Sequence, residues 1–180
     1  LYLEFCDDKK VHVPYSVNSL TATEDFYIPA IAKPLNGRSS EGLKHLTSKE
    51  ELSTFINKPN YIIQQMIPGP IYTVDYVRDN YNNDFAIARE ELLRTKNGAG
   101  ITVRIIENNL LTKTVSHIGF HLDIIGCVNM EFIYNDNKFY LIDINPRFSA
   151  GIAFSKLAGY DMVTSHLNSF TGKTICPHIK

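Results

Sequence analysis

The sequence has little of several features that mark particular classes of protein. Its three cysteines, Cys6, Cys127 and Cys176, are widely spaced and form no CxxC pair, which argues against a disulfide framework and a structural zinc site. No apolar run approaches the roughly 20 residues that a membrane-spanning helix needs, and the N-terminus lacks the order of a signal peptide. The 18 basic and 19 acidic residues nearly cancel, and no basic run marks a nucleic-acid surface. These absences predict a cytoplasmic protein with reduced thiols that binds neither nucleic acid nor membrane.

What is present is an ordinary globular composition. The chain has 180 residues, of which 44% are hydrophobic and 21% charged, and this length is enough to bury a core. One domain, or two small lobes that share a core, is therefore expected. The chain starts at Leu1 rather than at methionine, which predicts that it is cut from a longer polypeptide.

The hydrophobic pattern predicts many short strands and a few helices. Strands are expected at 26–34, 61–67, 71–78, 85–94, 101–106, 128–134 and 139–144, and helices at 48–56, 111–125, 152–158 and 161–170. Strands without strict alternation with helices indicate an α+β fold with mostly antiparallel sheets. The break at 68–70, Pro-Gly-Pro, predicts a boundary between a small lobe (1–67) and a larger one (68–180). The segment 35–43, rich in glycine and serine, predicts a mobile loop.

The segment 128–151, VNMEFIYNDNKFYLIDINPRFSAG, has the strongest chemical pattern. Side chains at i and i+2 of a strand share a face, so Asp143 and Asn145 project together, and Glu131 on the partner strand can join them. Two carboxylates and an amide oxygen are hard donors that suit Mg²⁺. Arg147 adds a planar donor suited to a phosphate or acyl phosphate. The alternative is an exposed hairpin face whose acids are merely solvated.

The shared metal site depends on the register of this hairpin. A two-residue turn at Asp136 and Asn137, with no bulge, would set Glu131 opposite Ile142, on the other face from Asp143. A shared site is therefore expected to need a three-residue loop, 136–138, which pairs Asn135 with Phe139 and sets Glu131 opposite Asp143. Asn137 is one of the few non-glycine residues that tolerate the left-handed conformation such a loop requires.

The segment resembles the end of the ATP-grasp fold, where a strand with an acid or amide precedes a strand reading acid-x-Asn-Pro-Arg, as in carbamoyl phosphate synthetase large chains and carboxylate-amine ligases. The resemblance spans about residues 13–172 and implies two lobes with the nucleotide between them. It also implies that Glu131, Asp143 and Asn145 hold Mg²⁺, with Mn²⁺ as an alternative, and that Arg147 faces the transferred phosphoryl group.

Two further segments extend the resemblance. AKPLNGRSSEGL, at 32–43, is similar to the family's Lys-Pro strand end and glycine-rich lid, and IIQQMIPG, at 62–69, is similar to the linker strand whose backbone binds the adenine edge. Arg89 is expected on a strand that faces the cleft, where it binds phosphate or water. The implied nucleotide contacts are Lys33 at the phosphates, Gly37, Arg38, Ser39, Ser40 and Gly42 in the lid, and Gln65, Met66 and Ile67 at the adenine.

The resemblance implies an activity and also shows departures from the family. The implied reaction is ATP- and Mg²⁺-dependent activation of a carboxylate or bicarbonate as an acyl phosphate, which an amine or ammonia then displaces, with Lys33 and Arg147 as the catalytic cations. The usual ribose-binding Glu position holds Ile71, and the family's preceding N-terminal domain is not visible. We therefore expect that domain from elsewhere in the polypeptide or from a separate subunit, with a homodimer as an open alternative.

Other interpretations of the same residues remain open at this stage. The chain as a whole fits a non-catalytic nucleotide-binding module or an ATP-grasp small-molecule kinase. Lys33 fits a solvated strand end and Met66 a core position. His117 and His121 have a spacing that can bind a metal, but without an evident third ligand.

Overall fold

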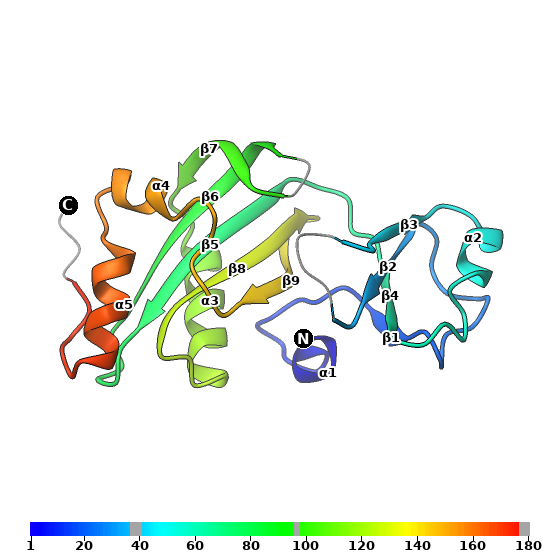
Figure 1. Cartoon of the computed structure of the whole chain (residues 1–180), viewed down its shortest axis with the longest axis horizontal. Coiled ribbons are helices and arrows are strands. Elements are labelled where there is room, and N and C mark those ends of the chain that lie inside the picture. The colour runs from blue at the N-terminus through cyan, green and yellow to red at the C-terminus, as the bar shows by residue number, and fades with distance from the viewer. Residues whose placement is uncertain (37–40, 96–97, 177–180) are drawn as a thin grey trace.

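The computed structural model describes residues 1–36, 41–95 and 98–176. Two antiparallel sheets lie at opposite ends of the molecule, a four-stranded one of order β1-β4-β2-β3 and a five-stranded one of order β7-β6-β5-β8-β9 (Figure 1). The α+β class and the mostly antiparallel sheets predicted from the sequence are confirmed.

The four-stranded sheet is built from residues 16–65. One face is apolar because alternate residues point to the same side, and Ala30, Ala32 and Ile63 pack there against Leu52 and Phe55. The short helix begins after Ser48, whose hydroxyl accepts a hydrogen bond from the Glu51 N–H. The elements are β1 (Ser16–Asn18), β2 (Ala30–Pro34), β3 (Lys44–Leu46), α2 (Lys49–Ser53) and β4 (Tyr61–Gln65).

The five-stranded sheet is covered differently on its two faces. One face packs against α3, through residues such as Val74, Met130 and Val115. Part of the other face packs through Val77 and Cys127 against the segment that carries α4 and α5. The rest of that second face holds the polar residues described below. The elements are β5 (Ile71–Arg78), β6 (Asp84–Arg94), β7 (Gly100–Ile106), α3 (Asn109–His121), β8 (Gly126–Asn135), β9 (Lys138–Asn145), α4 (Ile152–Leu157) and α5 (Met162–Phe170).

The N-terminal residues contact the five-stranded sheet. Helix α1 (Tyr2–Phe5) and the segment after it place Phe5 and Val11 in the core under α3. His117 and His121 each contact a carboxylate of this segment, with Nε2 at 2.7 Å from Asp8 Oδ2 and Glu4 Oε1 respectively. The expected small lobe, 1–67, places this N-terminal segment with the four-stranded sheet. The contacts of the segment described here are instead with α3 and the five-stranded sheet.

The hairpin formed by β8 and β9 differs from the expected one in its turn. Asn135 pairs with Lys138, so the turn has two residues, Asp136 and Asn137, both with positive φ. The three-residue loop was therefore wrong. Glu131 nevertheless lies opposite Asp143, because a bulge follows in which Phe132 pairs with Leu141 and Ile142 is the extra residue. The extra residue in the bulge therefore returns Glu131 and Asp143 to the same face, which the two-residue turn alone would not do.

The connection between the two sheets is held close to β8. A Cβ added at Gly69, whose φ is +146°, would lie 2.1 Å from the Tyr134 carbonyl oxygen, so only glycine fits there. The next residue, Pro70, accepts a hydrogen bond from the Tyr134 N–H at 3.1 Å. These contacts anchor the crossing segment on the five-stranded sheet.

No helix in the described ranges is long and apolar enough to cross a membrane.

Asp79 anchors the turn between β5 and β6 and ties a distant segment to it. Its buried carboxylate accepts hydrogen bonds from Tyr81, from the backbone and side chain of Asn83, and from the Ile175 N–H. Burial alone raises the pKa of Asp79, but these hydrogen bonds outweigh it and leave the pKa below its ordinary value.

Asp79→Asn is therefore expected to lower the free energy of unfolding by about 2 kcal/mol at pH 7. A lowered folded-state pKa gives stability that is present above the unfolded-state pKa and is lost as the pH falls through the folded-state value. Urea melts between pH 7 and pH 3 check this, because the parent should approach the variant at acid pH. A difference that is constant across this range would contradict the assignment.

Candidate functional site

The site lies on the face of the five-stranded sheet that α3 does not cover. Residues paired directly opposite each other on neighbouring strands share a face. Thr73 lies opposite both Arg89 and Glu131, and Glu131 lies opposite Asp143. The neighbouring row pairs Asp75 with Asn129, and Asn129 with Asn145. Acidic and amide side chains from β5, β8 and β9 therefore gather on one face.

The three expected metal donors lie together at the β9 end of these rows. Asn145 Nδ2 donates to Asp143 Oδ2 at 2.9 Å, and Arg147 donates from one guanidinium nitrogen to Asn145 Oδ1 at 3.1 Å. The described residues contain no group of three or more His, Cys, Asp or Glu suited to a metal. Two carboxylates and one amide oxygen are still a hard-oxygen donor set, and their shared face fits a Mg²⁺ ion that shares its coordination with phosphate and water.

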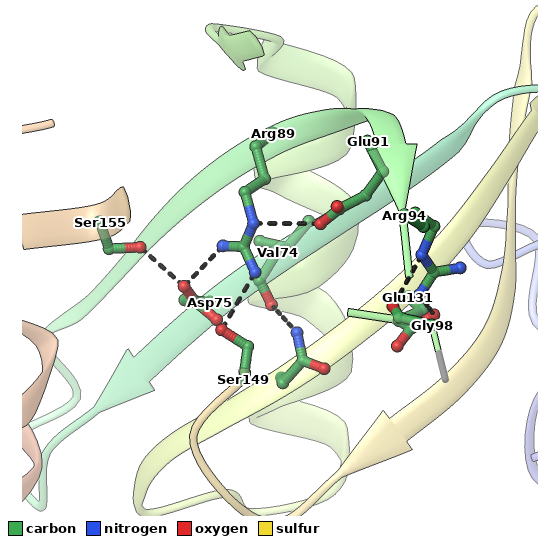
Figure 2. A network of polar contacts seen from close by, with 10 residues as sticks. Val74, Asp75, Arg89, Glu91, Arg94, Gly98, Glu131, Ser149 and Ser155 are labelled. Carbon is green, nitrogen blue, oxygen red and sulfur yellow. Dashed lines mark hydrogen bonds and ion pairs between the residues drawn. The ribbon is translucent and has the colours of Figure 1, made fainter. Parts of the chain in front are cut away.

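Arg94, at the end of β6, belongs to the site and was not identified from the sequence. Its guanidinium donates to Glu131 Oε2 at 2.9 Å and, through Nε, to the Gly98 carbonyl at 2.8 Å (Figure 2). The sequence signal was weak, because Arg94 lies past the part of β6 that pairs regularly with β7. The pairing of β6 with β7 becomes irregular after Glu91, so the alternation of residues along β6 does not predict the face on which Arg94 lies.

Lys33, the expected phosphate contact, belongs to the other sheet. It lies on β2 opposite Ile62, on the face that does not form the apolar core of the four-stranded sheet. Burial lowers the pKa of the Lys33 ammonium, while the carboxylates of Asp143 and Glu131 act in the opposite direction. The two acids therefore act electrostatically on a lysine of the other sheet and favour its charged form.

Arg89 is the centre of a buried polar network (Figure 2). Its side chain is 1% exposed and donates to Asp75 Oδ2 at 2.7 Å, to Glu91 Oε1 at 3.2 Å and to Ser149 Oγ at 3.0 Å. Ser155 also donates to Asp75 Oδ2, at 2.7 Å. The expected phosphate contact of Arg89 stays a prediction, and it would require these partners to be displaced.

Glu91 is the second acid of this network, and its position accounts for the glycine at position 100. The Glu91 side chain is 2% exposed, and a Cβ added at Gly100 would lie 1.8 Å from Glu91 Oε2. Any larger residue at position 100 would push the carboxylate off Arg89. Within the described residues, Glu91 Oε2 and Asp75 Oδ1 are buried without a hydrogen-bond partner. Because Arg89 forms an ion pair with the other oxygen of each acid, it is the cation that offsets both buried charges.

The backbone of the linker segment is largely engaged within the protein. The Gln65 N–H donates to the Tyr15 carbonyl at 2.8 Å, and the Met66 N–H donates to the Pro29 carbonyl at 3.2 Å. The Ile67 N–H has no acceptor among the residues that the structure describes. Of the three expected adenine contacts, Ile67 is thus the one whose N–H has no described acceptor, in a residue that is 8% exposed.

The expected lid is only partly covered by the structure. Gly37, Arg38, Ser39 and Ser40 lie outside the described residues. Gly42 is described: its φ is +74°, and a Cβ there would lie 2.8 Å from the Pro34 side chain. Gly42 therefore packs against the end of the strand that carries Lys33.

Comparison with known families identifies the fold. Residues 1–151 match the family model described as ATP-grasp domain. The chain belongs to the ATP-grasp family. The resemblance stated from the hairpin, the Lys-Pro strand end and the linker is therefore confirmed.

Known relatives agree with the assignment to the ATP-grasp family. The chain is 24% identical over 194 aligned residues to the carbamoyl phosphate synthase large chain of Clostridium acetobutylicum, across 93% of this chain and 18% of that protein. Among solved structures, N5-carboxyaminoimidazole synthetase from Staphylococcus aureus, complexed with ADP, matches with a TM-score of 0.78 and 17% identity over 94% of this chain. A biotin carboxylase from Campylobacter jejuni matches with a TM-score of 0.79 and 16% identity over 93%.

The ATP-grasp chain described here spans only part of each of these proteins. It covers 18% of the carbamoyl phosphate synthase large chain, 50% of the Staphylococcus aureus synthetase chain and 44% of the biotin carboxylase chain. At 16–17% identity the structural matches establish the fold alone.

Proposed function

We propose that this chain is the ATP-binding part of a Mg²⁺-dependent ligase of the carbamoyl phosphate synthetase type. The reaction would activate a carboxylate or bicarbonate as an acyl phosphate, which an amine or ammonia then displaces. The observation that supports this most is the shared face of Glu131, Asp143 and Asn145, whose acids favour the charged form of Lys33. A phosphate chain needs a cation on one side and a metal on the other, and the two sheets supply residues for both.

Each residue would act on the nucleotide in its own way. The Ile67 N–H, which has no described acceptor, would donate to the adenine edge. Lys33 would neutralise the phosphate chain, and Arg147 would hold the transferred phosphoryl group with its planar guanidinium. Such positioning and charge neutralisation account for most of phosphoryl-transfer catalysis. Ile71, at the start of β5, would contact the ribose without the hydrogen bond that a glutamate provides.

Glu131, Asp143 and Asn145 would hold Mg²⁺, or Mn²⁺ in its place. When bound, the ion would neutralise charge on the phosphates and bring their oxygens close to these side chains. The acid and the amine would meet at surfaces supplied in part by a preceding domain or a separate subunit, and the expected cytoplasmic location belongs to the same proposal.

The test is phosphate release by the full-length protein with ATP, Mg²⁺ and a panel of small carboxylic acids and bicarbonate, with and without ammonia and amines. Release that depends on both acid and amine is the expected result. A stable phosphorylated product formed without an amine would identify a kinase instead. Absence of turnover, together with nucleotide binding, would identify a binding module and contradict the ligase assignment.

A further inference from the structure

Two of the proposed metal donors are each held by an arginine. Arg94 donates to Glu131 Oε2 at 2.9 Å, and Arg147 donates to Asn145 Oδ1 at 3.1 Å. The third donor, Asp143, accepts from the Asn145 amide. The oxygens that would bind a cation thus already accept hydrogen bonds from the protein.

This arrangement has an electrostatic cause. Glu131 and Asp143 lie directly opposite each other on neighbouring strands, where like charges destabilise an antiparallel pair. A guanidinium on Glu131 offsets this repulsion in the absence of a metal. The side chains of Arg94 and Glu131 are 22% and 21% exposed, so water, ions and ligands can reach the pair.

A divalent cation bound at Glu131 would compete with Arg94 for the carboxylate. A divalent ion beside the carboxylate would attract it more strongly than a guanidinium does, and it would repel the guanidinium itself. Arg94 is also tethered through its Nε to the Gly98 carbonyl. Its outer nitrogens could therefore leave Glu131 while the side chain stays at the edge of the site.

We propose that Arg94 is a placeholder cation, which occupies Glu131 until a divalent metal displaces it and then contacts the terminal phosphate of the nucleotide. This rests on the proposed function, because the terminal phosphate is the oxyanion expected to share a metal with Glu131. A planar guanidinium suits such an oxyanion. Arg94 is thus assigned as a phosphate-contacting residue whose position responds to the metal.

The experiment compares the parent with Arg94→Gln in Mn²⁺ binding followed by electron paramagnetic resonance, without nucleotide. Arg94→Gln should bind Mn²⁺ about 2- to 5-fold more tightly, since its competitor is gone and a partly exposed ion pair is worth up to roughly a fivefold change. Arg104→Gln is the matched control, because Arg104 lies on β7, pairs with Glu90 and is 65% exposed. It removes the same charge away from the site and should bind Mn²⁺ like the parent.

A second arm uses calorimetry with ADP and a non-hydrolysable ATP analogue in the presence of Mn²⁺. The parent should prefer the analogue, and Arg94→Gln should lose about 10-fold of that preference. Arg94→Lys keeps the charge and should recover part of the preference for the analogue. This variant therefore distinguishes loss of the charge from a folding defect. Mn²⁺ binding by Arg94→Gln equal to or weaker than that of the parent would overturn the placeholder role, as an unchanged analogue preference would overturn the phosphate contact. A parent that shows no Mn²⁺-dependent nucleotide binding would instead overturn the proposed function itself.

Discussion

Replacing Asp143 with alanine is expected to abolish the tightening of ATP binding by Mg²⁺. Asp143 lies opposite Glu131 and next to Asn145 on the same face, so its loss removes one of two proposed carboxylate ligands. Loss of even an outer partner of a metal site costs about 10- to 100-fold in affinity, and we expect loss of a ligand to cost about 100-fold or more. Calorimetric titration with ATP, with and without Mg²⁺, measures this effect.

Thermal stability should change little in the same variant. Asp143 is exposed, and its removal relieves repulsion with Glu131, so a midpoint within a few degrees of the parent is expected. Glu90→Ala is the matched control, because it removes an acid that pairs with Arg104 outside the site. If Asp143→Ala binds Mg·ATP as tightly as the parent, the metal assignment is wrong.

Replacing Arg89 with methionine should have the largest effect on stability. The change leaves the carboxylates of Asp75 and Glu91 buried without their cation, and breaking a buried ion pair in this way costs about 3–5 kcal/mol. Urea unfolding should show a lower midpoint with an unchanged slope. The double variant Arg89→Met with Asp75→Asn should recover part of the loss, because one of the stranded charges is gone.

Two other arginine variants separate a structural role from a phosphate contact. Arg104→Met, on the exposed face of β7, should cost under about 1 kcal/mol. Arg89→Lys keeps the charge but loses the forked geometry, and it should have intermediate stability. If Arg89→Met is as stable as the parent, the network does not hold the fold. If Arg89→Lys is fully stable but binds ATP poorly, the phosphate contact expected from the sequence gains support.

The sequence predicted the α+β fold and the pairing of Glu131 with Asp143 in the hairpin of β8 and β9, and the structure bears out both. Alternation set Asp143 and Asn145 on one face, and Glu131 was expected opposite Asp143 and lies there. The route to that register was wrong, since Asp136 and Asn137 form a two-residue turn and a bulge at Ile142 corrects the parity. Bulges depend on tertiary fit, which a local pattern does not record.

Contacts between distant segments could not be predicted in the same way. The Arg94 contact with Glu131 joins residues 37 positions apart, and the packing of Phe5 against α3 joins the N-terminal segment to a helix that begins at Asn109. Arg89 was expected on a strand that faces the cleft, but the sequence pattern could not show that Asp75, Glu91 and Ser149 would enclose it. The alternation of residues along a strand predicts the face on which a side chain lies. The packing of the whole sheet decides which partners that side chain contacts.

A crystal structure of the chain with Mg²⁺ and a non-hydrolysable ATP analogue would show where the metal and the nucleotide bind. We expect electron density for a metal between the phosphates and the side chains of Glu131 and Asp143, with the Lys33 ammonium on the phosphate chain. We also expect the adenine beside the Ile67 N–H. A nucleotide bound elsewhere, or bound here with Glu131 and Asp143 both remote from the metal, would contradict this expectation.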